Sequence, residues 1–157
     1  MSLLQRLLLR DEGYRRSVYT DHLGYYTLGI GRMVDARKGG GVTLDEAMYL
    51  LDNDIREKTR ELGPHPPWLS RLDPVRHAVL LSMAFQLGAA GLLSFRNTLK
   101  AVEEGRWNDA AEGMMRSLWA RQTPGRALRL AEAMRTGDEG ALRLDEEPPS
   151  PPLPPHF

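Results

Sequence analysis

Three side chains near the start of the chain could carry out acid–base chemistry. Glu12 ends an apolar segment, Asp21 follows nine residues later, and Thr27 follows six residues after that. Two carboxyl groups held apart across a cleft are what hydrolysis of a glycosidic bond requires. One donates a proton to the leaving oxygen, and the other activates water or attacks the sugar. A carboxyl half-buried at a helix end would have a raised pKa and could act as the general acid.

Each of these residues also has a purely structural interpretation. Glu12 could be an ordinary exposed residue at a helix end, Asp21 could serve only to form a turn, and Thr27 could simply suit a strand. Competing motifs fit less well. Gly29-Ile30-Gly31 lacks the third glycine of a dinucleotide-binding loop. The four histidines have no metal-ligand spacing, so we expect neither a metal nor a cofactor.

The elements that must position these side chains can be predicted from the sequence pattern. Leucines recur on one face of a helix over residues 2–12, which Gly13 ends. Residues 17–34 alternate as in a hairpin or meander, with a polar turn at Asp21. A Thr43-x-x-Glu46 capping box predicts a long helix to about residue 62. Further helices are predicted from Asp73 to Gly88, over 94–103 and 107–116, and from Thr123 to Gly137.

The whole chain has 157 residues, enough for one domain or two lobes, and contains no cysteine. Its net charge is zero, but residues 138–157 carry −4 and residues 1–137 therefore carry +4. This weak positive charge suits an anionic polymer and does not distinguish cell wall from nucleic acid. No apolar run approaches the ~20 residues of a membrane span, and the first ten residues are too interrupted for a signal peptide.

A series of short motifs along residues 3–137 closely resembles, in the same order, the motifs of the phage lysozymes of the T-even type, glycoside hydrolase family 24. The N-terminal pattern is Glu12-Gly13, Tyr19-x-Asp21, Gly24-Tyr25-Tyr26-Thr27 and Gly29-Ile30-Gly31. Later matches are Asp73-x-Val75-Arg76, Met83-x-Phe85-Gln86-x-Gly88, Phe95-x-Asn97-x-Leu99, Arg106-Trp107-x-x-Ala110-Ala111, Trp119-x-x-Gln122-Thr123-Pro124-x-Arg126-Ala127 and Arg135-Thr136-Gly137.

The resemblance implies an α+β, mostly α, lysozyme-like two-lobe fold over residues 1–144. A small antiparallel sheet would lie in the N-terminal lobe, about 13–62. The helical C-terminal lobe, about 68–137, would also hold helix 2–12. Residues 145–157 are proline-rich and are expected to form a disordered or extended tail.

The resemblance also implies an inverting muramidase that cleaves the β-1,4 bond between N-acetylmuramic acid and N-acetylglucosamine in bacterial peptidoglycan. Glu12 would be the general acid, Asp21 and Thr27 would flank the attacking water, and Arg126 would pair with Glu12. The saccharide cleft would be lined by Met33, Phe85, Gln86, Thr98 and Gly113.

Two departures from the family pattern stand out. Arg32 replaces the usual histidine after Gly-Ile-Gly, and by alignment its partner would be Asp54 on the long helix. Only ten residues separate Arg32 from Thr43, where the best-known family member has a longer excursion, so the cleft could be more open there.

Two alternatives remain open from the sequence: a lytic transglycosylase, which can act with one acid and no water-positioning pair, and a non-catalytic wall-binding protein. For the leading interpretation we expect a monomer that lyses a host cell for a phage or prophage. We expect it to be made in the host cytoplasm and to reach periplasmic peptidoglycan by a holin-dependent route, without a signal peptide, membrane insertion or nucleic-acid binding. Whether it is released freely or carried in the virion stays open.

Overall fold

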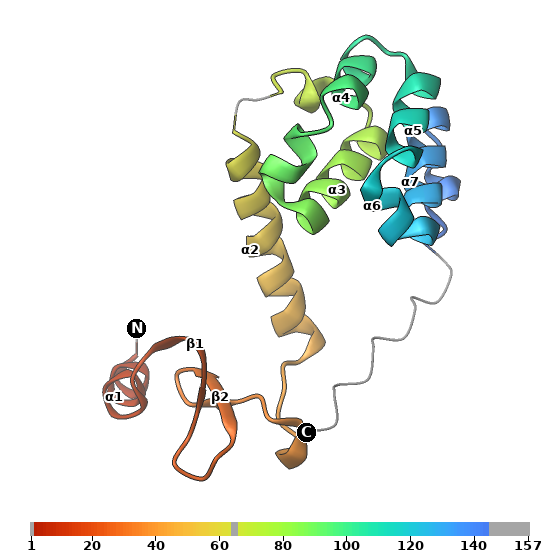
Figure 1. The fold of residues 1–157 in the computed structure, drawn as a ribbon. Helices are drawn as coiled ribbons and strands as arrows, with labels where there is room; N and C mark the ends of the chain where they lie inside the picture. Colours follow the sequence, from red (N-terminus) through yellow and green to blue (C-terminus); the bar gives the residue numbers. More distant parts are fainter. Residues whose placement is uncertain (1, 64–65, 145–157) are drawn as a thin grey trace. The chain divides into compact units, whose positions relative to one another are not determined.

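The computed structural model describes residues 2–63 and 66–144, and these form two compact units. The first unit runs to Asn53 and the second begins at Asp54. The described chain is mostly helical with one small antiparallel sheet near the N-terminus, which confirms the predicted fold class (Figure 1). The predicted tail, residues 145–157, lies outside the described residues. Docking of helix 2–12 on the helical lobe concerns two different units and stays a prediction.

Helix α1, Leu3–Glu12, carries Glu12 as its last residue. Ser2 and Gln5 form a capping box at its start: the Gln5 N–H donates to Ser2 Oγ at 3.1 Å, and the Ser2 N–H donates to Gln5 Oε1 at 2.6 Å. Gly13 has a φ of 71° and donates its N–H to the Leu9 carbonyl at 3.1 Å. Glycine is favoured at this positive φ, and the helix therefore ends where the sequence predicted.

The sheet of the first unit has the order β1-β2-β3, with β1 at Arg15–Thr20, β2 at Tyr26–Gly29 and β3 at Arg32–Met33. Both pairs are antiparallel, and Thr27 lies opposite Tyr19 on one side and Met33 on the other. A register irregularity separates Arg15 from Tyr19. A short 3₁₀ helix, η1 at Ala36–Lys38, follows β3.

Helix α2, Leu44–Leu62, begins with the predicted capping box and contains the boundary between the units. The Thr43 N–H donates to Glu46 Oε2 at 2.7 Å, and the Glu46 N–H donates to Thr43 Oγ1 at 3.3 Å. Two N–H groups at the helix start, which no helical carbonyl can reach, are thereby satisfied.

The second unit is helical and contains the main hydrophobic core (Figure 1). Its elements are η2 at Leu69–Arg71, α3 at Pro74–Leu93, α4 at Arg96–Glu103, α5 at Trp107–Met115, α6 at Leu118–Gln122, α7 at Pro124–Thr136 and η3 at Glu139–Leu142. Fully buried side chains come from α3, α4, α5 and α7, and the largest are Leu80, Met83, Leu92, Met114 and Met134. The predicted helices are confirmed, whereas α6 was not predicted.

Helix α3 corrects two sequence-based expectations. By length and composition this 20-residue helix could cross a membrane, so the statement that no apolar run approaches that length is wrong. Leu80, Met83 and Leu92 are instead fully buried in the core of the second unit, which accounts for the apolar composition. Gly88, with φ 75° and ψ 163°, breaks the helix where a stop was predicted, but helical structure resumes and continues to Leu93.

Arg76 joins the start of α3 to the end of α7. Its Nη1 donates to Asp73 Oδ2 at 2.9 Å, and its Nε donates to the Met134 carbonyl at 2.8 Å. Its Nη2 donates to the Arg135 carbonyl at 3.2 Å, and the guanidinium lies 4.1 Å from the centre of the Trp107 ring. Two of the family-like motifs, Asp73-x-Val75-Arg76 and Arg135-Thr136-Gly137, are therefore parts of one structural junction.

Candidate active site

Glu12 lies at the end of α1, against the turn between β2 and β3. A Cβ atom placed on Gly31 would be 2.9 Å from Glu12 Oε2 and 3.2 Å from its Cδ, and the φ of Gly31 is +69°. The carboxyl thus lies against a residue without a side chain. Glu12 is exposed in the structure.

Asp21 lies in the turn between β1 and β2 and shapes it. Its Oδ1 accepts the Leu23 N–H at 2.9 Å and the Tyr25 N–H at 2.8 Å. The hydrogen bond from the Tyr25 backbone lowers the pKa of the Asp21 carboxyl, with smaller contributions from Leu23 and from the charge of His22, against the opposing effect of desolvation. Asp21 is therefore held as a carboxylate, the form that a general base requires.

Thr27 is in the central strand and is buried, with 4% of its surface exposed. Its hydroxyl donates to the Tyr25 carbonyl at 3.4 Å, so the oxygen lone pairs remain available to accept a hydrogen bond. The turn that holds Asp21 precedes β2, and Gly31, which contacts Glu12, follows it. Asp21 therefore lies in the turn that leads into β2, and Glu12 contacts the turn that leaves it, with Thr27 in the strand between these turns.

Arg32 contacts a carboxylate that the sequence did not single out as its partner, Glu46. Arg32 Nη2 donates to Glu46 Oε2 at 2.7 Å, and Nε donates to the Gly41 carbonyl at 3.0 Å. Glu46 belongs to the first turn of α2, where the capping box fixes its side chain. The predicted pair of Arg32 with Asp54 joins residues of different units and stays a prediction.

In the second unit, Gln86 binds two of the side chains that the family motifs contain. Its Oε1 accepts the Trp119 Nε1–H at 2.8 Å and an Arg126 Nη1–H at 3.0 Å. These bonds fix the guanidinium of Arg126 beside Gln86. The predicted pair of Arg126 with Glu12 joins residues of different units and stays a prediction.

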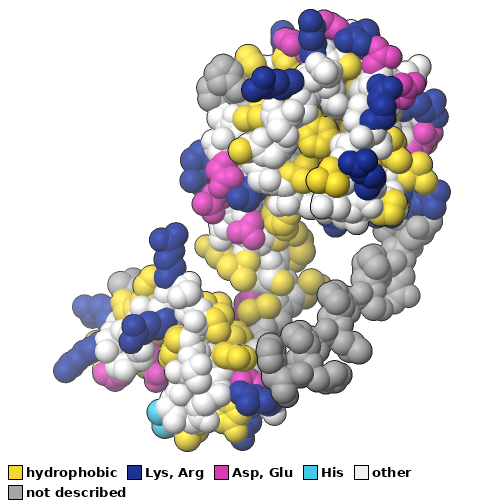
Figure 2. All heavy atoms as spheres, in the orientation of Figure 1, with side chains coloured by type: hydrophobic (Ala, Val, Ile, Leu, Met, Phe, Trp, Pro, Cys, Tyr) yellow, Lys and Arg dark blue, Asp and Glu magenta, His cyan; other side chains and the backbone are white. Residues whose placement is uncertain are grey.

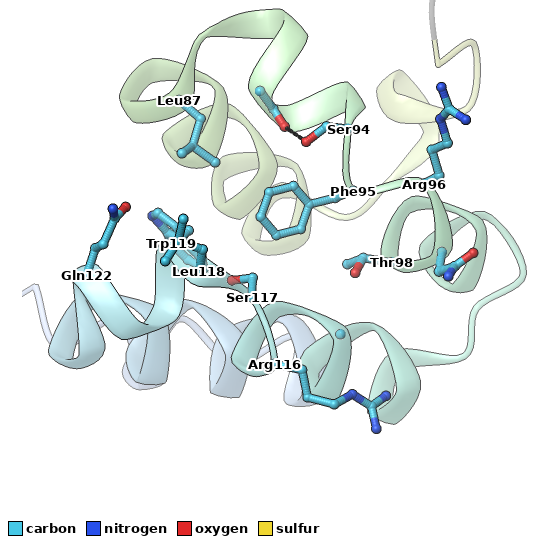
Figure 3. Close-up of a pocket in the computed structure, with 13 residues that line it drawn as sticks. Leu87, Ser94, Phe95, Arg96, Thr98, Arg116, Ser117, Leu118, Trp119 and Gln122 are labelled. Atoms are coloured by element: carbon cyan, nitrogen blue, oxygen red, sulfur yellow. Dashed lines mark hydrogen bonds between the residues drawn. The ribbon is translucent and has the colours of Figure 1, made fainter.

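A groove of about 740 Å³ opens between α3, α4, α5 and α6 of the second unit (Figure 3). Phe95 and Trp119 pack edge to face in it, with ring centres 6.4 Å apart. Thr98 and Gly113, both predicted cleft residues, face each other across α4 and α5, and a side chain on Gly113 would collide with Thr98 Oγ1. The structure therefore brings these two together in one groove.

Phe85 and Gln86 do not line this groove, and Phe85 is exposed. Met33 belongs to the first unit, and its predicted place in the saccharide cleft stays a prediction. Sequence reasoning did not assign a cleft role to Arg116, Ser117, Trp119 or Gln122, which do line it. The Trp119-x-x-Gln122 motif was the available signal for two of them. Basic and acidic side chains are interspersed over the visible face of this unit (Figure 2).

One unit of the chain holds two acidic side chains, Glu12 at the end of α1 and Asp21 in the turn before β2, and the other unit is helical and contains a groove. This arrangement defines a lysozyme-like glycoside hydrolase. The family model for phage lysozyme matches residues 10–134, and the chain belongs to the phage lysozyme family.

Curated relatives agree with this family assignment. The chain is similar to probable T4-type lysozyme 1 of Dictyostelium discoideum, with 28% identity over 91% of this chain and 99% of that protein. It is similar to the pre-baseplate central spike protein Gp5 of Enterobacteria phage T4, with 30% identity over 94% of this chain and 30% of that protein. It is also similar to peptidoglycan hydrolase gp36 of Pseudomonas phage phiKMV, with 30% identity over 76% of this chain and 14% of that protein.

Proposed function

We propose that this glycoside hydrolase is a muramidase that cleaves the β-1,4 bond between N-acetylmuramic acid and N-acetylglucosamine in bacterial peptidoglycan, with inversion at the anomeric carbon. The observation that carries the proposal is the environment of the two carboxyl groups. Asp21 is held ionised by backbone N–H groups, whereas Glu12 belongs to a separate element at the other end of β2. Different surroundings for two carboxyl groups are what distinct acid and base roles require.

In this mechanism Glu12 gives its proton to the glycosidic oxygen as the bond to the anomeric carbon breaks. A water molecule attacks that carbon from the opposite face and gives its proton to the Asp21 carboxylate. The Thr27 hydroxyl accepts a hydrogen bond from the same water and orients it. An inverting mechanism of this kind needs about 6.5–9.5 Å between the carboxyl groups so that the water fits between them.

The test of the acid role is Glu12→Gln, which keeps the shape of the side chain and removes the proton. General acid catalysis contributes ~10²–10⁴-fold, so clearance of permeabilised Gram-negative cells should slow by at least 100-fold. Asp11→Asn is the matched control, since Asp11 is an exposed carboxylate beside Glu12 on the same helix. A Glu12→Gln variant with a tenth of wild-type activity, or an equal loss in Asp11→Asn, would remove the assignment.

The products test the reaction type. Hydrolysis leaves hydrated reducing ends on the glycan fragments, whereas a lytic transglycosylase leaves 1,6-anhydro ends, and mass spectrometry separates the two. NMR of the first product anomer tests inversion: we expect the α anomer from a β-linked substrate, and an initial β anomer would indicate retention.

For the biological setting, we propose lysis of a host cell by a phage or prophage, with holin-dependent access to the wall. Expression in Gram-negative cells should then cause lysis only when a holin or a permeabilising agent opens the inner membrane. Lysis without either would contradict this route.

A further inference from the structure

The short segment between β3 and α2 contains a buried carboxylate with an unusually full set of donors. Asp35 has 3% of its surface exposed. Its Oδ2 accepts the Tyr26 N–H at 3.1 Å and Arg37 Nη2 at 2.6 Å, and its Oδ1 accepts the Arg37 N–H and Nε, each at 2.9 Å. The side-chain hydrogen bonds from Arg37 hold the pKa of Asp35 far below its usual range. Asp35 therefore fixes the Arg37 guanidinium in one orientation.

The fixed guanidinium reaches the turn that contains Asp21. Arg37 Nη2 donates to the Gly24 carbonyl at 2.8 Å, and the guanidinium lies 5.2 Å from the centre of the Tyr25 ring. The Gly24 carbonyl and the Tyr25 N–H belong to the same planar peptide group. That N–H is the group that donates to Asp21 Oδ1 at 2.8 Å. One peptide plane is thus held by Arg37 at its oxygen and by Asp21 at its hydrogen.

We propose that Asp35 and Arg37 act as a clamp that positions the Asp21 carboxylate for catalysis. The proposal rests on the proposed role of Asp21, and it makes Asp35 and Arg37 positioning residues, not catalytic ones. A hydrogen bond at the carbonyl end polarises the peptide and strengthens the bond that its N–H donates. Asp35 also binds the N–H of Tyr26, so both peptide groups that flank Tyr25 are restrained. Asp35 and Arg37 both lie in the ten-residue segment between Arg32 and Thr43.

Arg37→Lys is the decisive variant, because it keeps the positive charge beside the buried Asp35 carboxylate. An ammonium group cannot reproduce the fork with which Arg37 binds Asp35 while also reaching Gly24. Misplacing a reacting group by about 1 Å can cost ~100-fold in rate, so kcat should fall by roughly 10- to 100-fold. KM should stay within about twofold, because orientation of the base acts on the transition state. Asp35→Asn, which keeps the shape of residue 35, should lower kcat in the same way.

Lys38→Met is the matched control. Lys38 lies over the same Tyr25 ring, with Nζ 4.9 Å from its centre, and this substitution should leave kcat within about twofold of wild type. Circular dichroism and the melting temperature of each variant check that the fold is intact at the assay temperature. A variant that is unfolded there is assayed below its melting temperature, where the same loss of kcat is expected.

Asp21→Asn, measured in the same assay, separates failure of the clamp from failure of the proposed function. If Asp21→Asn is as active as wild type, the role of Asp21 and the clamp both fail. If Asp21→Asn is inactive while folded Arg37→Lys and Asp35→Asn keep wild-type kcat, only the clamp is overturned. A rise in KM at unchanged kcat in Arg37→Lys would also overturn it, since Arg37 would then act on substrate binding.

Discussion

Two glycines in the same hairpin show how closely a single residue can be tied to the site. Gly29 and Gly31 have nearly the same positive φ, +68° and +69°. A Cβ on Gly29 would meet nothing within 4 Å, whereas a Cβ on Gly31 would meet the Glu12 carboxyl. Comparing alanine substitutions at the two positions therefore separates two effects. Backbone strain is expected in both variants, whereas displacement of Glu12 is expected only for the substitution at Gly31.

We predict that Gly31→Ala lowers activity at least tenfold beyond Gly29→Ala. Both alanines carry the strain of a positive φ and should melt at lower temperature than wild type. Only the Gly31→Ala substitution would also displace Glu12, the proposed proton donor. The measurement is kcat for cell-wall hydrolysis together with the melting temperature. Equal loss of activity in the two variants would mean that strain alone explains the effect.

The free energy of unfolding at acidic pH tests the hydrogen bonding of Asp21 and Asp35. The pKa of each carboxyl is lowered in the folded protein from an ordinary value of 3.8. Each therefore contributes stability that is fully present above the unfolded-state pKa and is lost as pH falls through the folded pKa. We predict that the free energy of unfolding, measured with denaturant at several pH values, falls below about pH 4. Asp35→Asn should flatten this dependence, and an unchanged slope would contradict the prediction.

At the scale of elements, boundaries with local chemical causes could be predicted from the sequence. Gly13, the Thr43-x-x-Glu46 box and the Asp73-Pro74 pair each fix a helix end through contacts within a few residues. Helix α6 could not be predicted in this way, because its five residues are too short to show helical periodicity.

Contacts between elements were harder to predict. Glu12, Asp21 and Thr27 were singled out by their residue types and motif spacing. The exposure of Glu12 and the contact of Arg32 with Glu46 depend on packing that the pattern does not contain. The sequence did not point to the Asp35–Arg37 clamp, because an Asp-x-Arg sequence is common. Only the hydrogen bond from Arg37 to the Gly24 carbonyl indicates the proposed role.

A double-mutant cycle tests the contact of Arg32 with Glu46. Arg32→Met with Glu46→Gln should show a favourable coupling in unfolding free energy that weakens as salt is added, because both side chains are about half exposed. The same cycle with Asp54→Asn in place of Glu46→Gln tests the predicted Asp54 pair separately. A cycle that shows no coupling between Arg32 and Glu46 would contradict the contribution of their contact.

For the molecule as a whole, the junction at Arg76 should matter more to stability than any surface ion pair. Arg76→Met keeps much of the side-chain volume but leaves the Met134 and Arg135 carbonyls without this donor. Unsatisfied groups of this kind cost about 1–3 kcal/mol, so we predict a loss of that order in the free energy of unfolding. Lys100→Met, at an exposed position on α4, should change it by less than about 0.5 kcal/mol. Equal effects of the two substitutions would contradict the role of the junction.

The boundary between Asn53 and Asp54 also separates the tyrosines of the chain from its tryptophans. All five tyrosines precede the boundary, at residues 14, 19, 25, 26 and 49, and all three tryptophans follow it, at residues 68, 107 and 119. Tryptophan emission therefore reports on the helical unit alone. The tyrosine contribution to the absorbance reports on the unit that holds Glu12 and Asp21. One thermal scan of the unlabelled protein, followed through both signals, can show whether the two units melt as a single cooperative block or in succession.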